Sequence, residues 1–312
     1  MYNGIMNVYK EAGFTSHDVV AKLRGICKQK KIGHTGTLDP DAVGVLPVCL
    51  GSGTKLCDML TDWDKEYIAV LRLGVTTDTQ DMSGRILRQC PAGEAQRLDP
   101  EAVKAAVLGF VGDYDQIPPM YSALKVNGRK LYELARAGKE VERQARQVQI
   151  LEIRVDKVEL PRVWMTVTCS KGTYIRTLCH DIGGKLGCGG CMEHLTRTRV
   201  DRFDIKDSLR LDEIERIRDE GGLDTCILPV ETALEGYAGL KVLPEADAFL
   251  YNGNPCFKGQ LDAGDGCLDG LEDGLRFRMY DSKGHFVGVY EYQDSRHWWK
   301  PWKMFLAAPE RT

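Results

Sequence analysis

Two alternating apolar runs near the middle of the chain constrain the fold most strongly. Apolar side chains occupy every second position at 151–155 and again at 163–169, and Leu160-Pro161 separates the two runs. A period of two is typical of strands with one buried face, and a short break between two such runs predicts an antiparallel hairpin. A third alternating run at 67–73 and an apolar stretch at 3–9 predict two further strands.

Helical patterns lie between these strands at irregular intervals. Thr15, followed by an acidic residue three positions later, predicts the start of a helix. Asp99-Pro100 predicts a second helix start, and Thr173 predicts the N-cap of a helix that ends near residue 186. The stretch 31–44 has neither period and is predicted to be a loop. Because no regular strand–helix–strand repeat is present, the pattern favours an α+β fold over a doubly wound parallel sheet.

Length and composition indicate a globular protein of about two domains. The 312 residues are 43% hydrophobic and 28% charged, which provides enough apolar surface for a core and excludes wholesale disorder. No stretch reaches the roughly 18 apolar residues of a membrane helix, and residues 1–10 lack the order of a signal peptide. We therefore expect a cytoplasmic protein with no membrane segment, whose eleven cysteines are reduced thiols.

Charge is unevenly distributed along the chain. The 42 basic and 45 acidic residues nearly cancel, so the total does not indicate a nucleic-acid binder. Residues 1–35 nevertheless carry six basic side chains against two acidic ones, and residues 120–150 carry seven against three. These segments predict a face that binds a polyanion, although solvated helix surfaces would have the same composition.

The stretch 33–47 contains the first candidate catalytic residue. It places His34 and Asp39 in a loop, and Pro40 keeps Asp39 in an extended conformation. The glycines match neither the phosphate-binding loop nor the dinucleotide pattern, which argues against nucleotide hydrolysis. The alternative is a common Asp-Pro turn with a histidine that packs in the interior.

A second cluster at 170–177 places Arg176 in the first turn of the third predicted helix. A cation is unfavourable there because the helix dipole favours an acid at the N-terminus. We therefore expect a buried carboxylate such as Asp39 to neutralise Arg176, whose guanidinium would keep that acid ionised against desolvation. The alternative is an exposed arginine at a helix start.

Cys188-Gly-Gly-Cys191 is the one closely spaced cysteine pair, and two histidines lie near it in the sequence. The pair suggests a zinc or redox site, but structural zinc normally has four ligands at regular spacing. We expect no metal and, because no cofactor motif is present, no cofactor.

Four ordered blocks of the sequence resemble one known family. They include Gly-His-Thr-Gly-Thr-Leu-Asp-Pro at 33–40 with 15–20 before it, Gly-Val-Thr-Thr-Asp-Thr-Gln-Asp-Met-Ser-Gly at 74–84 with 65–67, Ile-Pro-Pro-Met-Tyr-Ser-Ala-Leu-Lys at 117–125 continuing to 136, and 169–183. Over about residues 3–203 the chain closely resembles the bacterial tRNA pseudouridine-55 synthases of the TruB family.

The resemblance implies a fold and an activity. It implies an α+β pseudouridine synthase catalytic domain at 1–236, with a mixed, mainly antiparallel sheet flanked by helices. A small β-rich, PUA-like RNA-binding domain would follow at 237–312. The implied activity is isomerisation of uridine 55 in the T loop of tRNA to pseudouridine, by a monomer that needs no cofactor and no obligatory protein partner. Which atom the aspartate attacks stays open, between C6, C1′ and a glycal route.

The resemblance also assigns roles to residues. Asp39 corresponds to the catalytic aspartate, Arg176 to its ion-pair partner and Tyr67 to the aromatic side chain that stacks on the target base. The implied substrate-binding residues are His34, Leu195, Lys125 and Tyr174. His34 resembles the residue that enters the tRNA loop, and Leu195 resembles the apolar wall over the uracil.

Further family positions are assigned to structure. Asp78 and Asp81 are expected to organise their loop, with Thr77 and Thr79 as hydrogen-bond partners. Two departures from the family pattern, Lys10-Glu11 in place of Lys-Pro and Asp201 in place of a glycine, are expected not to touch the chemistry.

The segment 296–303 holds three of the five tryptophans among basic residues. It suits either RNA contacts or the core of the small domain, and we favour the core.

Two alternative functions are also considered. One is an RNA-binding chaperone that folds tRNA with incidental catalysis. The other is a guide-RNA-dependent pseudouridine synthase, which shares the chemistry.

Overall fold

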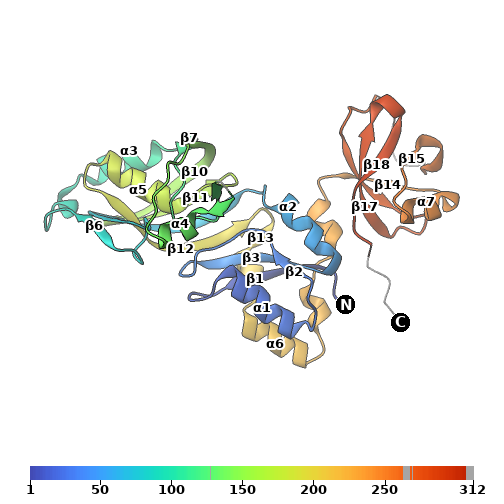
Figure 1. Cartoon of the computed structure of the whole chain (residues 1–312), viewed down its shortest axis with the longest axis horizontal. Helices are drawn as coiled ribbons and strands as arrows, with labels where there is room; N and C mark the ends of the chain where they lie inside the picture. The colour runs from blue at the N-terminus through green and yellow to red at the C-terminus, as the bar shows by residue number, and fades with distance from the viewer. Residues whose placement is uncertain (127, 263–267, 269, 307–312) are drawn as a thin grey trace.

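The computed structural model describes residues 1–126, 128–262, 268 and 270–306 (Figure 1). Nine strands form a large sheet: β1 Gly4–Lys10, β2 Ile32–His34, β3 Val43–Leu50, β4 Lys65–Leu73, β7 Gly112–Gln116, β10 Arg146–Glu159, β11 Arg162–Cys169, β12 Gly190–Val200 and β13 Phe203–Asp204. Its main path runs β1-β3-β12-β4-β11-β10-β7, while β2 pairs with β3 and β13 with β12. Only the β12–β3 pairing is parallel, so the sheet is mixed and mainly antiparallel, as predicted.

Helices and two small hairpins complete this part of the chain. The helices are α1 Ser16–Ile26, α2 Cys57–Leu60, α3 Pro100–Leu108, α4 Leu131–Arg136, α5 Ile175–Lys185 and α6 Leu211–Asp219. The hairpins are β5 Val75–Thr77 with β6 Ile86–Gln89, and β8 Lys125–Val126 with β9 Arg129–Lys130. No helix among the residues named above as described is long and apolar enough to cross a membrane.

Apart from a cluster that it shares with the C-terminal sheet, the large sheet carries two apolar cores. One lies beneath α3 and α5, on the half of the sheet that contains β4, β10 and β11. The other lies between α1, α6 and the half formed by β1 and β3 (Figure 1). The halves meet where β3 and β12 run parallel for only two residue pairs. This short seam is where the loop at 35–42, between β2 and β3, and the start of α5 come together.

The hairpin of β10 and β11 confirms the alternating-run prediction, with one difference in phase. Ile150 and Ile153 are buried, but Leu151 is 42% exposed. The register shifts between Ile150 and Glu152, so an irregularity turns Leu151 to the solvent. The predicted loop at 31–44 is also partly wrong, because Ile32–His34 pairs with β3 as a short strand.

Two of the three predicted helix starts are confirmed. Thr15 and Asp18 form a capping box at α1, and Asp99 caps α3. The third is wrong, because α5 begins at Ile175 with Tyr174 as N-cap, and the Thr173 hydroxyl donates to Ser170 O.

A tertiary contact replaces the local cap at α5. Gln116 of β7 accepts a hydrogen bond from Tyr174 N at 2.7 Å and donates one to Tyr174 O at 3.0 Å. Both main-chain groups of the N-cap residue are therefore satisfied by a side chain that is 58 positions away in the sequence.

A second sheet lies in the C-terminal part, in the order β14-β16-β17-β18-β15. Its elements are β14 Ala238–Lys241, α7 Asp247–Tyr251, β15 Cys256–Phe257, β16 Arg276–Tyr280, β17 Phe286–Gln293 and β18 Trp298–Met304. The core prediction for the tryptophans is right for Trp299, which is 1% exposed, whereas Trp298 and Trp302 are half-buried. Val289 and Phe305 pack with residues of β1 and β3, which joins the two sheets.

We predict that Thr15→Ala lowers the free energy of unfolding by about 1 kcal/mol, because it removes the acceptor for Asp18 N. Thr15→Ser keeps the hydroxyl and should unfold at nearly the same urea concentration as the unchanged chain. Equal stability of the alanine and serine variants would show that the capping box does not stabilise α1.

Candidate active site

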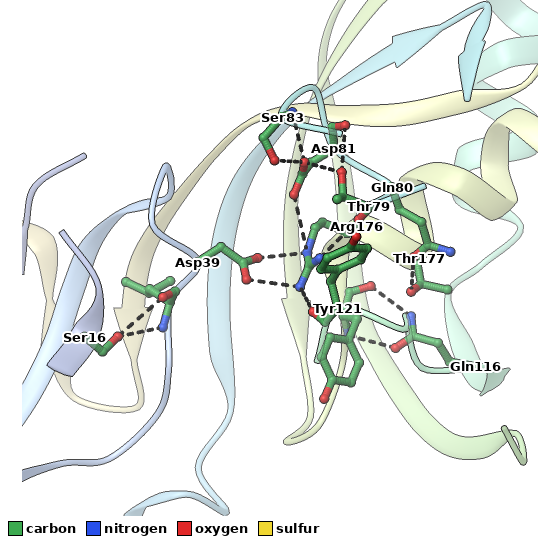
Figure 2. A network of polar contacts seen from close by, with 12 residues as sticks. Ser16, Asp39, Thr79, Gln80, Asp81, Ser83, Gln116, Tyr121, Arg176 and Thr177 are labelled. Carbon is green, nitrogen blue, oxygen red and sulfur yellow. Dashed lines mark hydrogen bonds and ion pairs between the residues drawn. The ribbon is translucent and has the colours of Figure 1, made fainter. Parts of the chain in front are cut away.

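Asp39 and Arg176, which are 137 residues apart, meet at the seam between the two halves of the sheet (Figure 2). Arg176 Nε lies 2.9 Å from Asp39 Oδ2, and Arg176 Nη2 donates to Asp39 Oδ1 at 3.0 Å. Two parallel contacts from one guanidinium to one carboxylate are the geometry of an ionised acid and a strong, directional pair. The predicted neutralisation of Arg176 by Asp39 is therefore confirmed.

The rest of the Arg176 side chain is also fully engaged. It is 6% exposed and donates to Thr79 O at 3.1 Å and to Tyr121 O at 2.9 Å. Asp81 Oδ2 lies 3.9 Å from Arg176 Nε, so a second carboxylate faces the same cation. Figure 2 shows these groups converging on the guanidinium, which fixes it in one orientation.

The loop that carries Asp39 is anchored through its main chain on both sides. Leu38 N donates to the buried Ser16 hydroxyl at 2.9 Å, and the Lys10 ammonium donates to Pro40 O at 2.9 Å. Gly13 N also donates to Pro40 O. Contacts with α1 and β1 therefore hold in place the turn from which the carboxylate projects.

The electrostatic environment of Asp39 combines opposing effects. Burial raises the pKa of Asp39 above its ordinary value, and the Asp81 charge raises it further. The Arg176 charge and its hydrogen bond lower the pKa, and Lys10 adds a smaller effect in the same direction. The side chain remains 35% exposed, so a substrate can reach a carboxylate that Arg176 keeps charged.

Lys10 corrects one expectation from the sequence, that the basic residues of segment 1–35 lie on a charged surface. It is not a solvated basic residue, because it is fully buried and donates to three carbonyl groups, those of Glu11, Phe14 and Pro40. Burial lowers its pKa to about 8. Although the unusual Glu11 itself pairs with Arg210, the neighbouring lysine holds the loop that bears the candidate catalytic acid.

The second departure from the family pattern, Asp201 in place of a glycine, lies at a turn. Asp201 follows β12 and has φ of 48°, in the left-handed region that glycine adopts most easily. Aspartate tolerates this conformation better than most residues, which explains how it replaces a glycine there. Asp201 N donates to Asp64 O, and Asp201 makes no recorded contact with Asp39 or Arg176.

The loop between β5 and β6 follows the structural prediction for its aspartates. Asp78 accepts from Arg85 N at 2.8 Å, and the Asp81 carboxylate accepts from the hydroxyl of Thr79 at 2.7 Å. Thr77 donates to the Asp81 carbonyl at 2.6 Å. The contact of Asp81 with Arg176 was not predicted, since nothing in the sequence relates the two positions.

Tyr67 and Leu195 lie together in the core beneath α5, in one cluster with Leu38. Each is 8% exposed. Burial raises the pKa of the Tyr67 hydroxyl, while Arg197 opposes that shift with its charge and a hydrogen bond. Leu38 precedes Asp39, so the loop that carries the carboxylate packs into the same cluster as the aromatic ring.

Arg197 is a site residue that sequence reasoning missed. It is 2% exposed and donates to Val45 O at 2.7 Å and to Gly36 O at 3.1 Å, so it ties β12 to the Asp39 loop. Gly44 permits this approach, because a Cβ there would lie 2.2 Å from Arg197 O and its φ is +109°. The alternating Thr-Arg-Thr-Arg run at 196–199 looks solvent-facing, so it gives no signal of a buried arginine.

The three other predicted substrate-binding residues, Tyr174, His34 and Lys125, lie in different environments. Tyr174 is half-buried beside the pair, and the charges of both Arg176 and Asp39 act on its hydroxyl. His34 is half-buried and contacts the ring of His17. Lys125 is exposed on the small hairpin of β8 and β9, and no recorded contact joins it to Asp39. The structure thus brings Tyr174 to the ion pair and leaves Lys125 at the surface.

The two cysteines of the Cys188-Gly-Gly-Cys191 pair contact different groups. The Cys188 thiol donates to Gly189 O and the Cys191 thiol to Met82 Sδ. Burial raises the pKa of both thiols, to about 11 for Cys191, which disfavours the thiolate that a metal needs. Within the described part of the chain, no group of three or more His, Cys, Asp or Glu residues is placed to hold a metal ion.

Comparison with known proteins assigns the chain to a family. A model described as "TruB family pseudouridylate synthase (N terminal domain)" matches residues 24–175, and one described as "tRNA pseudouridylate synthase B C-terminal domain" matches residues 176–235. The tRNA pseudouridine synthase B of Lachnoclostridium phytofermentans is 51% identical, over 97% of this chain and 100% of that protein. The Clostridium tetani protein of the same name is 47% identical over 80% of this chain and 84% of its own.

Solved structures agree in fold. A chain in an H/ACA RNP bound to a substrate RNA containing 2′-deoxyuridine has a TM-score of 0.71 at 24% identity, covering 97% of this chain and 85% of that one. A chain in a Cbf5-Nop10-Gar1 complex has a TM-score of 0.71 at 26% identity, with the same coverage. With 51% identity to a full-length relative and family models that match its central residues, the chain belongs to the TruB family of tRNA pseudouridine synthases, which are isomerases.

Proposed function

We propose that the protein converts uridine 55 in the T loop of tRNA to pseudouridine, without a cofactor or a protein partner. The single observation that carries the proposal is the Asp39 carboxylate, held by both oxygens on a buried Arg176, in a loop whose Leu38 packs in one cluster with Tyr67. The names of similar relatives support tRNA as the substrate.

The isomerisation conserves all atoms of the nucleotide. The bond between N1 and C1′ breaks, the uracil ring turns, and a bond forms between C5 and C1′. The C5 proton leaves and N1 gains a proton, so no oxidant or phosphate donor is consumed. Asp39 serves as the nucleophile or as the base that drives elimination at the sugar, and both roles need the charged carboxylate that Arg176 favours. Because Arg176 is already fixed by two carbonyls, little reorganisation is needed when the substrate binds.

The target base must leave the stacked loop to reach Asp39, at a cost of a few kcal/mol. Stacking on Tyr67 offsets this by about 1–3 kcal/mol. Leu195 shares the apolar cluster of Tyr67 and would cover the uracil, while Tyr174 borders the pair. His34 would fill the space that the base leaves.

The tRNA backbone would lie on two exposed basic segments. Lysines and arginines at 22–31 are exposed on α1 and just after it, and most of those at 125–146 are exposed around α4. Exposed cations that neutralise phosphates make affinity depend on salt. Lys125 belongs to this second surface rather than to the ion-pair site.

We also propose that residues 237–312 form a separate RNA-binding domain next to a catalytic domain at 1–236. Its second sheet exposes Phe257 by 49%, and the Phe257 ring lies 5.7 Å from that of Trp298. The Arg296 guanidinium lies 4.8 Å from the Trp298 ring. Aromatic faces beside an exposed arginine are suited to unpaired nucleotides.

The two alternative functions differ in testable ways. A chaperone does not need a charged acid fixed on a buried arginine, which favours catalysis. A guide-dependent enzyme would need guide RNA and partner proteins, and the similar chains found in multi-component complexes are only 24–26% identical to this chain, against 51% for a full-length tRNA pseudouridine synthase B. Activity of the purified chain on a bare tRNA transcript would support the stand-alone enzyme, and activity only with guide RNA and partner proteins would contradict it.

Asp39→Asn is predicted to lower single-turnover formation of pseudouridine by roughly 10³-fold or more, because the amide cannot act as nucleophile or base. Tritium release from C5-labelled tRNA measures the reaction. Asp41→Asn is the matched control, since Asp41 is an exposed carboxylate two residues away. A parental rate for Asp39→Asn would refute the catalytic assignment.

Substitution of Arg176 is predicted to move the acidic limb of the pH–rate profile to higher pH. Burial already places the pKa of Asp39 above its ordinary 3.8, and Arg176 opposes that shift. Activity needs the ionised acid, so it falls as the pH drops through this pKa. Arg176→Lys should shift the limb modestly and Arg176→Met further. If the acidic limb of the pH–rate profile stays at the same pH in variants that remain folded, then Arg176 does not control the charge of Asp39.

Phe257→Ala is predicted to weaken tRNA affinity by about 10-fold, within the range of about 1–3 kcal/mol for one stacked base. The single-turnover rate at saturating enzyme should not change, because Phe257 lies in the second sheet. Phe249→Ala, a control at a phenylalanine of α7 that is 52% exposed, should leave affinity unchanged. Equal affinities of the two variants would contradict RNA binding by this surface.

A further inference from the structure

His17 lies in the first turn of α1 and contacts His34 edge to face. The ring centroids are 5.6 Å apart and the ring planes are inclined by 80°. His17 is exposed, and the chemistry proposed above does not use it. Its position beside the one half-buried histidine of the Asp39 loop therefore calls for a separate explanation.

His34 has no polar group to fix its orientation. It is half-buried, and its Nδ1 has no hydrogen-bond partner in the described part of the chain. Burial, together with the charges of His17 and Arg197, lowers its pKa to about 4, so the ring is neutral near pH 7. A neutral ring without a hydrogen bond must be held by packing, and His17 supplies an aromatic contact of preferred geometry.

The turn that carries His17 is itself rigid and joined to the Asp39 loop. Thr15 and Asp18 on either side form the capping box of α1. The adjacent Ser16 hydroxyl bonds both main-chain groups of Leu38, the residue before Asp39. One helical turn therefore contacts both the loop that presents the carboxylate and the histidine at its other end.

We propose that His17 is a positioning residue for RNA: its ring holds the His34 ring in the orientation in which His34 occupies the space vacated by the target base. This inference rests on the proposed function. His17 acts through His34, so its removal should affect capture of the folded tRNA loop rather than the bond-breaking step. The requirement is for an aromatic ring, not for a charge or a hydrogen bond.

The test compares three substitutions in the full chain with tRNA transcript as substrate. His17→Ala and His17→Gln, which lack a ring, should raise KM by about 3- to 10-fold, the range expected from losing one aromatic pair, with kcat unchanged. His17→Phe should restore the parental KM. Parental KM in the alanine variant, or failure of phenylalanine to restore it, would overturn the proposal.

A double-mutant cycle with His34→Ala identifies the route of the effect. If His17 acts through His34, then His17→Ala should have no further effect in the His34→Ala background. Additive effects, or a smaller salt dependence of tRNA affinity in His17→Ala, would overturn the proposal in favour of a direct phosphate contact. An inactive parental chain would instead refute the proposed function, so the two failures are distinguishable.

Discussion

The ion pair of Asp39 and Arg176 is the interaction on which the site depends. It joins the loop between β2 and β3 to the start of α5, and Leu38 and Ala42 on either side of Asp39 pack into the core beneath α5. A guanidinium that is 6% exposed must be neutralised, so the loss of its carboxylate partner would leave a buried charge uncompensated. The same contact favours the charged form of the acid and opposes the increase in its pKa that burial causes. Stability at the seam and reactivity of the carboxylate therefore arise from one contact.

The contacts around the ion pair explain why its geometry is fixed. Main-chain carbonyls of Thr79 and Tyr121 hold the arginine, while Lys10 and Ser16 hold the residues on either side of Asp39. Each of these contacts joins segments that are far apart in the chain. The loop is thus preorganised before any substrate arrives, which is the condition for electrostatic stabilisation of a reaction.

The groups proposed to bind RNA lie apart from the residues proposed to carry out the chemistry. Exposed basic segments, the histidine pair and the second sheet all lie outside the ion pair, and each is proposed to bind a different part of the RNA. Their separation means that affinity and rate can be changed independently. In the proposed reaction, the cost of extracting the base is met by several weak contacts rather than by the candidate catalytic acid.

The sequence by itself determined the α+β class, the central hairpin, the capped starts of α1 and α3, and the pairing of Asp39 with an arginine, because these follow from local periodicity, capping chemistry and the cost of a buried charge. Only the tertiary structure decided which lysines are buried, that Gln116 rather than Thr173 satisfies the start of α5, and that Arg197 lies inside. Those features depend on contacts between distant segments, and a charged or polar side chain has the same local pattern whether a distant carbonyl or water satisfies it.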